Sequence, residues 1–357
     1  MSIRSIISFA SRNWLTVAFV GGFITDLILL NRIDDFIDNA ILAAYVTLAT
    51  VSILMFYAGA SEKLGMTLSR LVVRHAPVLM QYAFGGLLSG MLIFYGRSGD
   101  WLASAPFMVL ILAVIIGNEL FEKRSELLVW QLALYFIGIF SYSVLVLPVI
   151  LGKTGDGIFI LSGLIAVSVF VIVVQLLYRI VPNFLTRNIR RLIIVIGGLY
   201  VGMTSMYFMN LIPPIPLSLT ELDIVESVYR DNNGNYVITD EEQSWYRKLP
   251  FTREIINPDG TRLGCFARVY APTRLEVEIF HRWEYKNEEG QWEEVFRFGY
   301  PITGENQGGY RGYTILDSFW DGVWRCGVEN ERGQVLGRTV VEIDSRRANG
   351  ETVTRIE

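Results

Sequence analysis

Residues with catalytic potential are sparse in this sequence. Nucleophilic catalysis needs a Ser, Cys or Lys nucleophile beside a base, but the chain has two histidines, two cysteines and no HExxH-type spacing. His281 lies on the apolar face of a predicted strand, which favours a hydrogen-bonded core histidine over a base or ligand. Glu276, Glu278 and Glu284 lie on the polar face of that strand, where charges are normally solvated rather than paired across a cleft. We therefore expect no enzyme, no catalytic residue, no cofactor and no metal centre.

One stretch could bind calcium. Its oxygen-bearing residues occupy positions 1, 3, 5, 9 and 12 of a calcium-binding loop: Asp231, Asn233, Asn235, Thr239 and Glu242. Position 6, where the sharp turn needs glycine, is Tyr236, and a bulky side chain disfavours positive φ. Asn232–Asn235 is also a strong turn signal between two short strands, Val225–Arg230 and Tyr236–Thr239. The plain hairpin is the preferred interpretation, and a calcium-modulated module is the alternative.

A group of aromatic and basic residues could form a binding surface. The segment near Gly304–Gly312 is rich in glycine and is followed by further aromatic residues. An exposed platform there could hold a sugar, a peptide or a partner protein, because amphipathic rings are enriched at interfaces. Core packing or loop anchoring is the preferred interpretation of these residues, and the exposed platform is the alternative. With two residues of the preceding strand, the binding candidates are Tyr310, Arg311, Tyr313, Trp320, His281 and Trp283.

Both cysteines of the chain lie in its C-terminal part. Cys265 and Cys326 fall in predicted strands, and residues 1–212 contain no cysteine. An oxidising exterior permits a disulfide that closes a loop of about 60 residues. A buried pair of free thiols is the alternative.

The elements that must position these residues change in character at one segment, Leu211–Leu217. Three prolines within four residues end any helix there, since proline lacks the backbone N–H and clashes with the preceding turn. Residues 1–212 carry a net charge of +4, and residues 213–357 carry −8. The sequence thus predicts a polytopic helical membrane domain over 1–212, a Pro-rich hinge over 213–219 and a polar domain over 220–357. The acidic polar domain argues against a nucleic-acid partner, because phosphates require clustered basic groups.

About seven apolar runs approach the ~20 residues that cross a hydrocarbon core. The first is short and contains Asp26, and no cleavable signal peptide is evident before it. The runs are roughly Trp14–Leu30, Ala40–Ala60, Pro77–Tyr95, Ala103–Leu120, Leu127–Leu147, Gly157–Tyr178 and Leu192–Leu211.

The basic residues between these runs predict the orientation of the chain. Summed over alternate loops, eleven Lys and Arg fall on one side and three on the other. Because positive residues stay on the cytoplasmic side, we expect a cytoplasmic N-terminus and a polar domain outside. The larger set is Arg4, Arg12, Lys63, Arg70, Arg74, Lys123, Arg124, Arg179, Arg187, Arg190 and Arg191, and the smaller is Arg32, Arg97 and Lys153.

Polar groups within the runs are few. Asp26 could serve a proton or ion path, although an isolated acid in lipid is costly without being functional. Glu119 lies near the end of the fourth run. Gly86–Gly90 and Gly198–Gly202 place small residues one turn apart, which lets helices approach closely. Packing within the bundle is the preferred interpretation of both pairs, and homo-oligomer formation is the alternative.

The polar domain has the alternation typical of half-buried strands. From Leu263 onward, several short strands are separated by turn signals such as Glu288–Gly290 and Glu331–Gly333. Strands at this spacing predict an all-β, sandwich-like domain with its core over 263–343.

Five stretches of this domain resemble the bacterial domain of unknown function 2914 (DUF2914), in particular its membrane-anchored, multi-pass members. They are Cys265–Pro272, His281–Trp283, Gly309–Thr314, Gly322–Arg325 and Gly333–Arg338. The proline hinge and the apolar half are similar to those of the long members as well. The resemblance implies a bacterial envelope protein with a small β domain, and it implies no catalytic residues.

The preferred hypothesis is a binding or interaction module held at the outer, periplasmic face of the bacterial inner membrane. Its expected partners are membrane lipids and an envelope protein or glycan. The alternative is a component of a transport or envelope-assembly system, with the β domain as a cap and Asp26 as the intramembrane acid.

Overall fold

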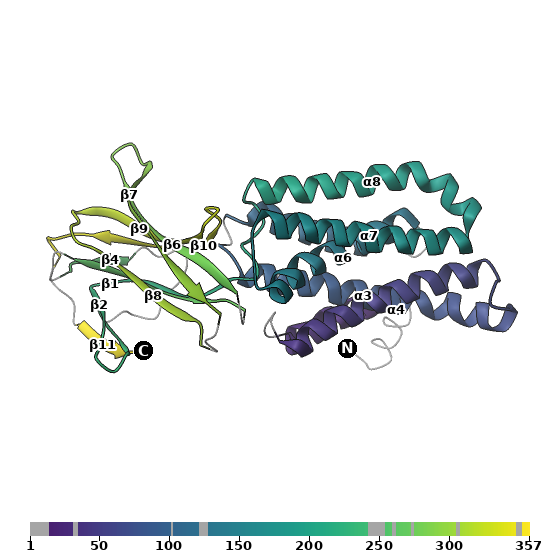
Figure 1. The fold of residues 1–357 in the computed structure, drawn as a ribbon, viewed down its shortest axis with the longest axis horizontal. Helices are drawn as coiled ribbons and strands as arrows, with labels where there is room; N and C mark the ends of the chain where they lie inside the picture. The colour runs from purple at the N-terminus through teal and green to yellow at the C-terminus, as the bar shows by residue number, and fades with distance from the viewer. Residues whose placement is uncertain are drawn as a thin grey trace, which may run out of the picture. The chain divides into compact units, whose positions relative to one another are not determined.

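The computed structural model describes residues 14–30, 35–100, 103–120, 128–241, 254–258, 262–272, 275–304, 308–347 and 352–357 (Figure 1). The chain divides into two compact units. One comprises Met1–Gly96 with Ser104–Ile212 and is helical, and the other comprises Arg97–Ala103 with Pro213–Glu357 and is built of strands. The change of structure therefore falls at the proline-rich segment.

The helical unit contains seven described helices. They are α2 (Trp14–Leu29), α3 (Phe36–Ala60), α4 (Met66–Arg97), α5 (Ala105–Leu120), α6 (Leu128–Leu151), α7 (Asp156–Ile180) and α8 (Pro182–Phe208). Five of these, α3, α4, α6, α7 and α8, are long and apolar enough to cross a membrane. α2 and α5 carry shorter apolar stretches, Val17–Leu29 and Ala105–Asn118. Each predicted run thus overlaps a helix, and five helices reach spanning length.

Glycines allow close helix contacts around α4. A Cβ on Gly85 would overlap the Phe19 carbonyl of α2, and one on Gly86 would overlap the Tyr45 ring of α3. Gly90 packs on Leu42, also of α3. The Gly86–Gly90 pair therefore packs within the bundle, as predicted. By contrast, Gly198 and Gly202 of α8 have no described heavy atom within 4 Å of an added Cβ.

The second unit contains three sheets. Its strands are β1 (Ser218–Val225), β2 (Ser227–Arg230), β3 (Tyr236–Glu241), β4 (Glu254–Ile256), β5 (Leu263–Tyr270), β6 (Glu276–Lys286), β7 (Trp292–Thr303), β8 (Tyr310–Leu316), β9 (Gly322–Asn330), β10 (Val335–Ile343) and β11 (Thr352–Ile356). The strand orders are β1-β5-β8, β4-β10-β9-β6-β7 and β11-β3-β2. The predicted hairpins β6–β7 and β9–β10 are both antiparallel pairs.

The three-stranded sheet β1-β5-β8 and the five-stranded sheet share their apolar core. Ile279, His281 and Trp283 of β6 are fully buried, as the alternating pattern predicts. One cluster joins residues from both sheets: Ile224, Ile256, Leu263, Cys265, Trp283, Leu316, Trp324, Cys326, Val341 and Ile343. Burying the two indole rings, Trp283 and Trp324, removes a large apolar area from water and is a main source of stability.

The third sheet, β11-β3-β2, packs on the other side of β5. Phe266, which points away from its neighbours Cys265 and Ala267 in the strand, is fully buried with Val225, Val228 and Ile238. β2 and β3 form the predicted hairpin. β11 lies outside the predicted core of 263–343 but joins this sheet by pairing with β3.

Glu284 departs from the solvated state expected of it. The side chain is buried and ion-paired with Arg325. Burial alone would raise the pKa of Glu284, but the hydrogen bond and charge of Arg325, with the charge of Arg282, hold that pKa below its usual value. A β-bulge between Trp283 and Glu284 interrupts the alternation of side chains along β6, and both neighbouring side chains are buried.

Candidate ligand-binding pocket

The β2–β3 hairpin positions the first two residues of the pocket. Its register places Arg230 directly opposite Tyr236, so their side chains share one side of the hairpin. The Asp231 carboxylate accepts hydrogen bonds from the backbone N–H groups of Asn233 (2.9 Å) and Asn235 (2.7 Å). Gly234 takes the positive φ of 88° that the turn requires. The turn is thus fixed by its own polar residues.

The calcium alternative does not fit the described part of this stretch. Strand pairing holds Thr239 opposite Ser227 and Thr354, whereas a calcium loop would wrap its position-9 residue around the ion. Asp231 is already engaged by backbone N–H groups of the turn. Glu242, the twelfth position, lies outside the described residues. The stretch is therefore described as a hairpin.

The pocket itself forms where the hairpin meets the start of β8. It has a volume of about 190 Å³ and is lined by Arg230, Gly234, Tyr236, Tyr310 and Arg311. Tyr310 and Arg311 are held by the β5–β8 pairing, opposite Val269 and Arg268. Gly309, just before them, has a φ of 83°. Two of the predicted binding residues, Tyr310 and Arg311, thus line this cavity.

Two hydrogen bonds and one cation–π contact order the residues that line the pocket. Arg230 Nε donates to the Gly234 carbonyl at 3.1 Å, and its guanidinium lies 5.7 Å from the centre of the Tyr236 ring. The Tyr236 hydroxyl donates to the Arg311 carbonyl at 3.0 Å. Burial raises the pKa of Tyr236, although the charges of Arg230 and Arg311 oppose this shift. The Tyr236 side chain is therefore neutral, and its hydroxyl ties the hairpin to β8.

The two arginines of the pocket are poorly neutralised. The nearest carboxylate to Arg311 Nε is Glu357 Oε2, at 3.9 Å, and that buried Nε makes no hydrogen bond in the described structure. Among the described residues, no carboxylate lies within 4 Å of the Arg230 guanidinium. Arg268, nearby on β5, is by contrast paired with Glu221 at 3.0 Å and with Glu357. The pocket is a positive site within an acidic unit.

The other binding candidates lie elsewhere. Tyr313 packs edge-on against Tyr236, with ring centres 6.0 Å apart, and so supports the pocket from the core side. Trp320 is 48% exposed and packs on Tyr285 and Trp324, away from the pocket residues. His281 and Trp283 belong to the buried core, because the face of β6 that carries them packs against the opposite sheet.

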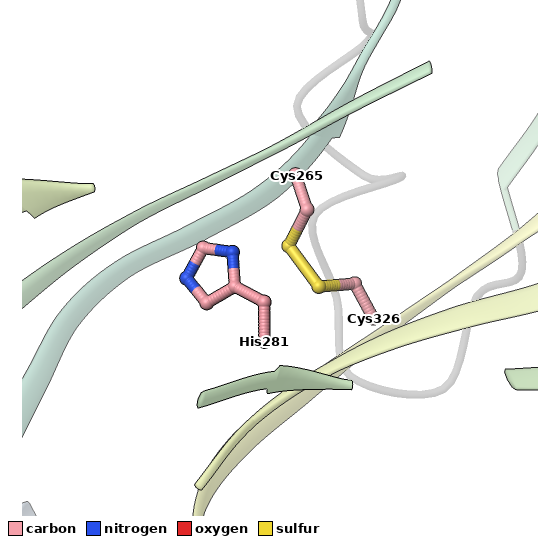
Figure 2. Close-up of side chains that lie close together, drawn as sticks. All are labelled: Cys265, His281 and Cys326. Carbon is pink, nitrogen blue, oxygen red and sulfur yellow. A yellow bond between two sulfur atoms is a disulfide. The ribbon is translucent and has the colours of Figure 1, made fainter. Parts of the chain in front are cut away.

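His281 lies beside the cysteine pair in the core (Figure 2). Cys265 and Cys326 form a disulfide that joins β5 of one sheet to β9 of the other. Although the sulfur atoms and a ring nitrogen of His281 lie within 4.8 Å of one another, sulfurs bonded to each other offer no thiolate to a metal. The sequence alone did not decide between a disulfide and two free thiols, and the structure contains the disulfide.

Hydroxyl groups hold both ring nitrogens of His281. Nδ1 lies 3.0 Å from Thr314 Oγ1, and Nε2 lies 2.7 Å from the Tyr300 hydroxyl. Trp283 Nε1 donates to the same Thr314 oxygen at 3.1 Å. Burial lowers the pKa of His281 to about 3, because a charged ring would lose its hydration. This neutral network satisfies buried polar groups of the core and does not require a ligand.

Asp26 lies in a separate polar cluster of the helical unit. Its carboxylate is fully buried and accepts hydrogen bonds from the Tyr45 hydroxyl (2.7 Å) and from the Ser89 hydroxyl. These partners come from α3 and α4, so the acid joins three helices. The side chain of Glu119, the other acid named from the sequence, lies outside the described side chains.

Sequence reasoning missed Arg230 and Tyr236 as pocket residues. The signal was present, because the predicted hairpin around Asn232–Asn235 places them opposite each other. Their proximity to Tyr310 and Arg311 depends on how the hairpin packs on β5 and β8, which a local pattern does not specify.

Comparison with known proteins supports one part of these assignments. The profile of a family described as "Protein of unknown function (DUF2914)" matches residues 276–343, so the predicted resemblance is confirmed over those residues. No curated protein matches the chain. Among solved structures, the alkylpurine DNA glycosylase AlkC of Pseudomonas fluorescens, bound to DNA containing an abasic site analog, aligns at 10% identity and a TM-score of 0.24. The alignment covers 83% of this chain and 78% of that one, and at this score it carries no argument about fold or function.

Proposed function

We propose that this protein is a multi-pass protein of the bacterial inner membrane that presents its β unit, a sandwich, as a binding module on the periplasmic face. The observation that carries the binding role is the pocket between the β2–β3 hairpin and β8, with its two arginines and two tyrosines. We propose that an envelope protein or glycan is its partner and that it catalyses no reaction.

Membrane insertion is supported by the outer surfaces of the long helices. Side chains such as Ile172 of α7 and Ile193 and Ile194 of α8 are more than half exposed, a state that lipid tails accommodate and water does not. α2 and α5 complete seven crossings in this proposal. Lipids are therefore partners of the helical unit, and the open face at Gly198 and Gly202 is where self-association would occur.

The proposed orientation follows from the charge asymmetry of the loops. Lys63 Nζ donates to the Arg179 carbonyl in the last turn of α7 at 2.9 Å, so these two members of the basic set lie at the same end of the helical unit. The test is single-cysteine labelling of the full chain with a membrane-impermeant maleimide in spheroplasts. Arg346→Cys in the β unit should be labelled, and Lys63→Cys should be labelled only after permeabilisation. The reverse pattern would refute the orientation.

The binding role is tested by photo-crosslinking in intact cells. The crosslinker p-benzoylphenylalanine would replace Tyr310 in the pocket or, as a control, Tyr229, which is exposed on β2 outside the pocket lining. A defined adduct at Tyr310 alone is expected. Equal yields at both positions, or none at either, would contradict a binding module.

A second candidate function is supported by the buried Asp26 cluster. A carboxylate that joins three membrane helices could take part in proton-coupled transport, with the β unit as a cap. Asp26→Asn keeps the hydrogen-bonding shape and removes the titratable group. Proton flux in proteoliposomes that is equal for the wild type and Asp26→Asn would remove this candidate.

A further inference from the structure

We propose that the pocket of Arg230, Tyr236, Tyr310 and Arg311 binds an oxyanion, that is, a carboxylate or phosphate group of its ligand. This inference rests on the proposed binding function and names the chemical class that the site would take. The group would be the acidic end of a larger polar molecule or a small anion by itself.

The first support is the unusual state of the two arginines. The β unit has a net charge of −8 over residues 213–357, so carboxylates are plentiful, and most of its other described arginines are paired with one. Arginines with a carboxylate within 4 Å include Arg262, Arg268, Arg282, Arg297, Arg325 and Arg355. Arg230 has none among the described residues, and Arg311 has only a contact at 3.9 Å.

Two like charges that line one small cavity repel each other, and an anion bound between them attracts both. Both arginines line this cavity, and both guanidinium charges lie close enough to the Tyr236 hydroxyl to act on it. Guanidinium groups present planar donors that match carboxylate and phosphate oxygens, often two at a time. An oxyanion is therefore the ligand class that this charge arrangement fits best.

The second support is that Arg230 and the backbone of Arg311 are held in place before any ligand binds. Arg230 Nε is tied to the Gly234 carbonyl, and the Asp231-capped turn fixes that carbonyl. The backbone of Arg311 is tied to the Tyr236 hydroxyl. Side chains that are already ordered lose less conformational entropy on binding. The Nη groups of Arg230 and Arg311 make no hydrogen bond to a described residue and remain as donors.

The third support is size. A cavity of about 190 Å³ is below the roughly 300–1,000 Å³ of pockets that enclose whole drug-sized molecules. It therefore suits a single acidic group with the few atoms around it. The two tyrosines add ring surface and hydroxyl groups for the polar body that carries the anion.

The test is calorimetric titration of the full chain in a non-ionic detergent at constant ionic strength. The probes are inorganic phosphate, D-glucuronate and, as the neutral match to glucuronate, D-glucose. Binding of phosphate or glucuronate but not glucose is expected, and the stronger of the two identifies the source of the oxyanion. Affinity should fall as ionic strength rises, since the site is partly open to solvent.

Variants locate the binding. Arg230→Gln and Arg311→Gln should each weaken anion binding tenfold or more, because each removes a charged hydrogen-bond donor. Arg346→Gln removes the same charge from an exposed position outside the pocket and should leave affinity unchanged. Near-UV circular dichroism of each variant checks that the fold is retained.

Two results would overturn the inference. One is the failure of both anions to bind the wild-type chain, and the other is equal anion affinity in the wild type and the folded Arg230→Gln and Arg311→Gln variants. Crosslinking at Tyr310 separates this failure from that of the proposed function, because the crosslinker reports occupancy whatever the ligand's charge. An adduct at Tyr310 without anion binding would leave the binding module standing and the oxyanion class refuted.

Discussion

Acidification should destabilise the β unit through His281. Burial lowers the pKa of this ring to about 3 in the folded chain, against about 6.5 in an unfolded chain. The unfolded state therefore binds more protons between these values, so the stability of the folded state rises with pH there and is lost as pH falls below about 6.5. Integration of this difference from pH 7 to pH 5 gives a loss of about 2 kcal/mol.

The assay is urea unfolding of the full chain in detergent at pH 7 and pH 5, followed by tryptophan fluorescence. Trp283 and Trp324 lie in the core of the β unit and report its unfolding. The matched control is His281→Gln, which does not titrate but retains an amide near Thr314 and Tyr300. The carboxylates and His75, the other histidine of the chain, are common to both proteins, and their contributions cancel.

The quantity of interest is the difference in pH dependence, not the stability of the variant itself. We expect the wild type to lose about 2 kcal/mol more than His281→Gln between pH 7 and pH 5. Equal losses in the two proteins would refute the reasoning, since they would mean that His281 is hydrated or charged in the folded state.

Two further predictions concern the same core. Replacing Cys265 and Cys326 together by alanine should lower the free energy of unfolding by about 4 kcal/mol in the chain-entropy model, because the disulfide closes a loop with a sequence separation of 61. The urea midpoints of the oxidised wild type and the double variant would measure this loss, and unchanged midpoints would contradict it. Gly312→Ala should lower the free energy of unfolding by roughly 1–3 kcal/mol, because the new Cβ would overlap the Tyr300 hydroxyl. In the same assay the control Gly308→Ala, whose Cβ meets no described atom within 4 Å, should lower it much less. Equal losses in the two variants would show that the overlap at Gly312 is relieved without cost.

The features that follow local rules were accessible from the sequence. Apolar runs and the prolines of Leu211–Leu217 predict where helices give way to strands, since run length and proline chemistry act locally. The β6–β7 and β9–β10 hairpins follow from alternation and turn residues. The burial of His281 and Trp283 follows from the same alternation.

The features that depend on distant contacts were not accessible. Tyr310 and Arg311 could be named as candidates, but their partners Arg230 and Tyr236 are about 75 residues away in the sequence, as the Tyr236–Arg311 hydrogen bond shows. The burial of Glu284 requires a β-bulge and Arg325 on the adjacent strand β9. A strand's polar face predicts solvent exposure only when the neighbouring strands bring no ion-pairing partner.

The most direct test of the binding role is the paired crosslinking measurement in intact cells, at Tyr310 in the pocket and at Tyr229 outside it. The proposed function predicts a defined adduct at Tyr310 and none at Tyr229, and the oxyanion inference adds that the Tyr310 adduct is lost when Arg230→Gln and Arg311→Gln are introduced. Equal adducts at the two positions, or none at either, would contradict a ligand held in this pocket, whereas a Tyr310 adduct that survives both arginine substitutions would contradict only the oxyanion class.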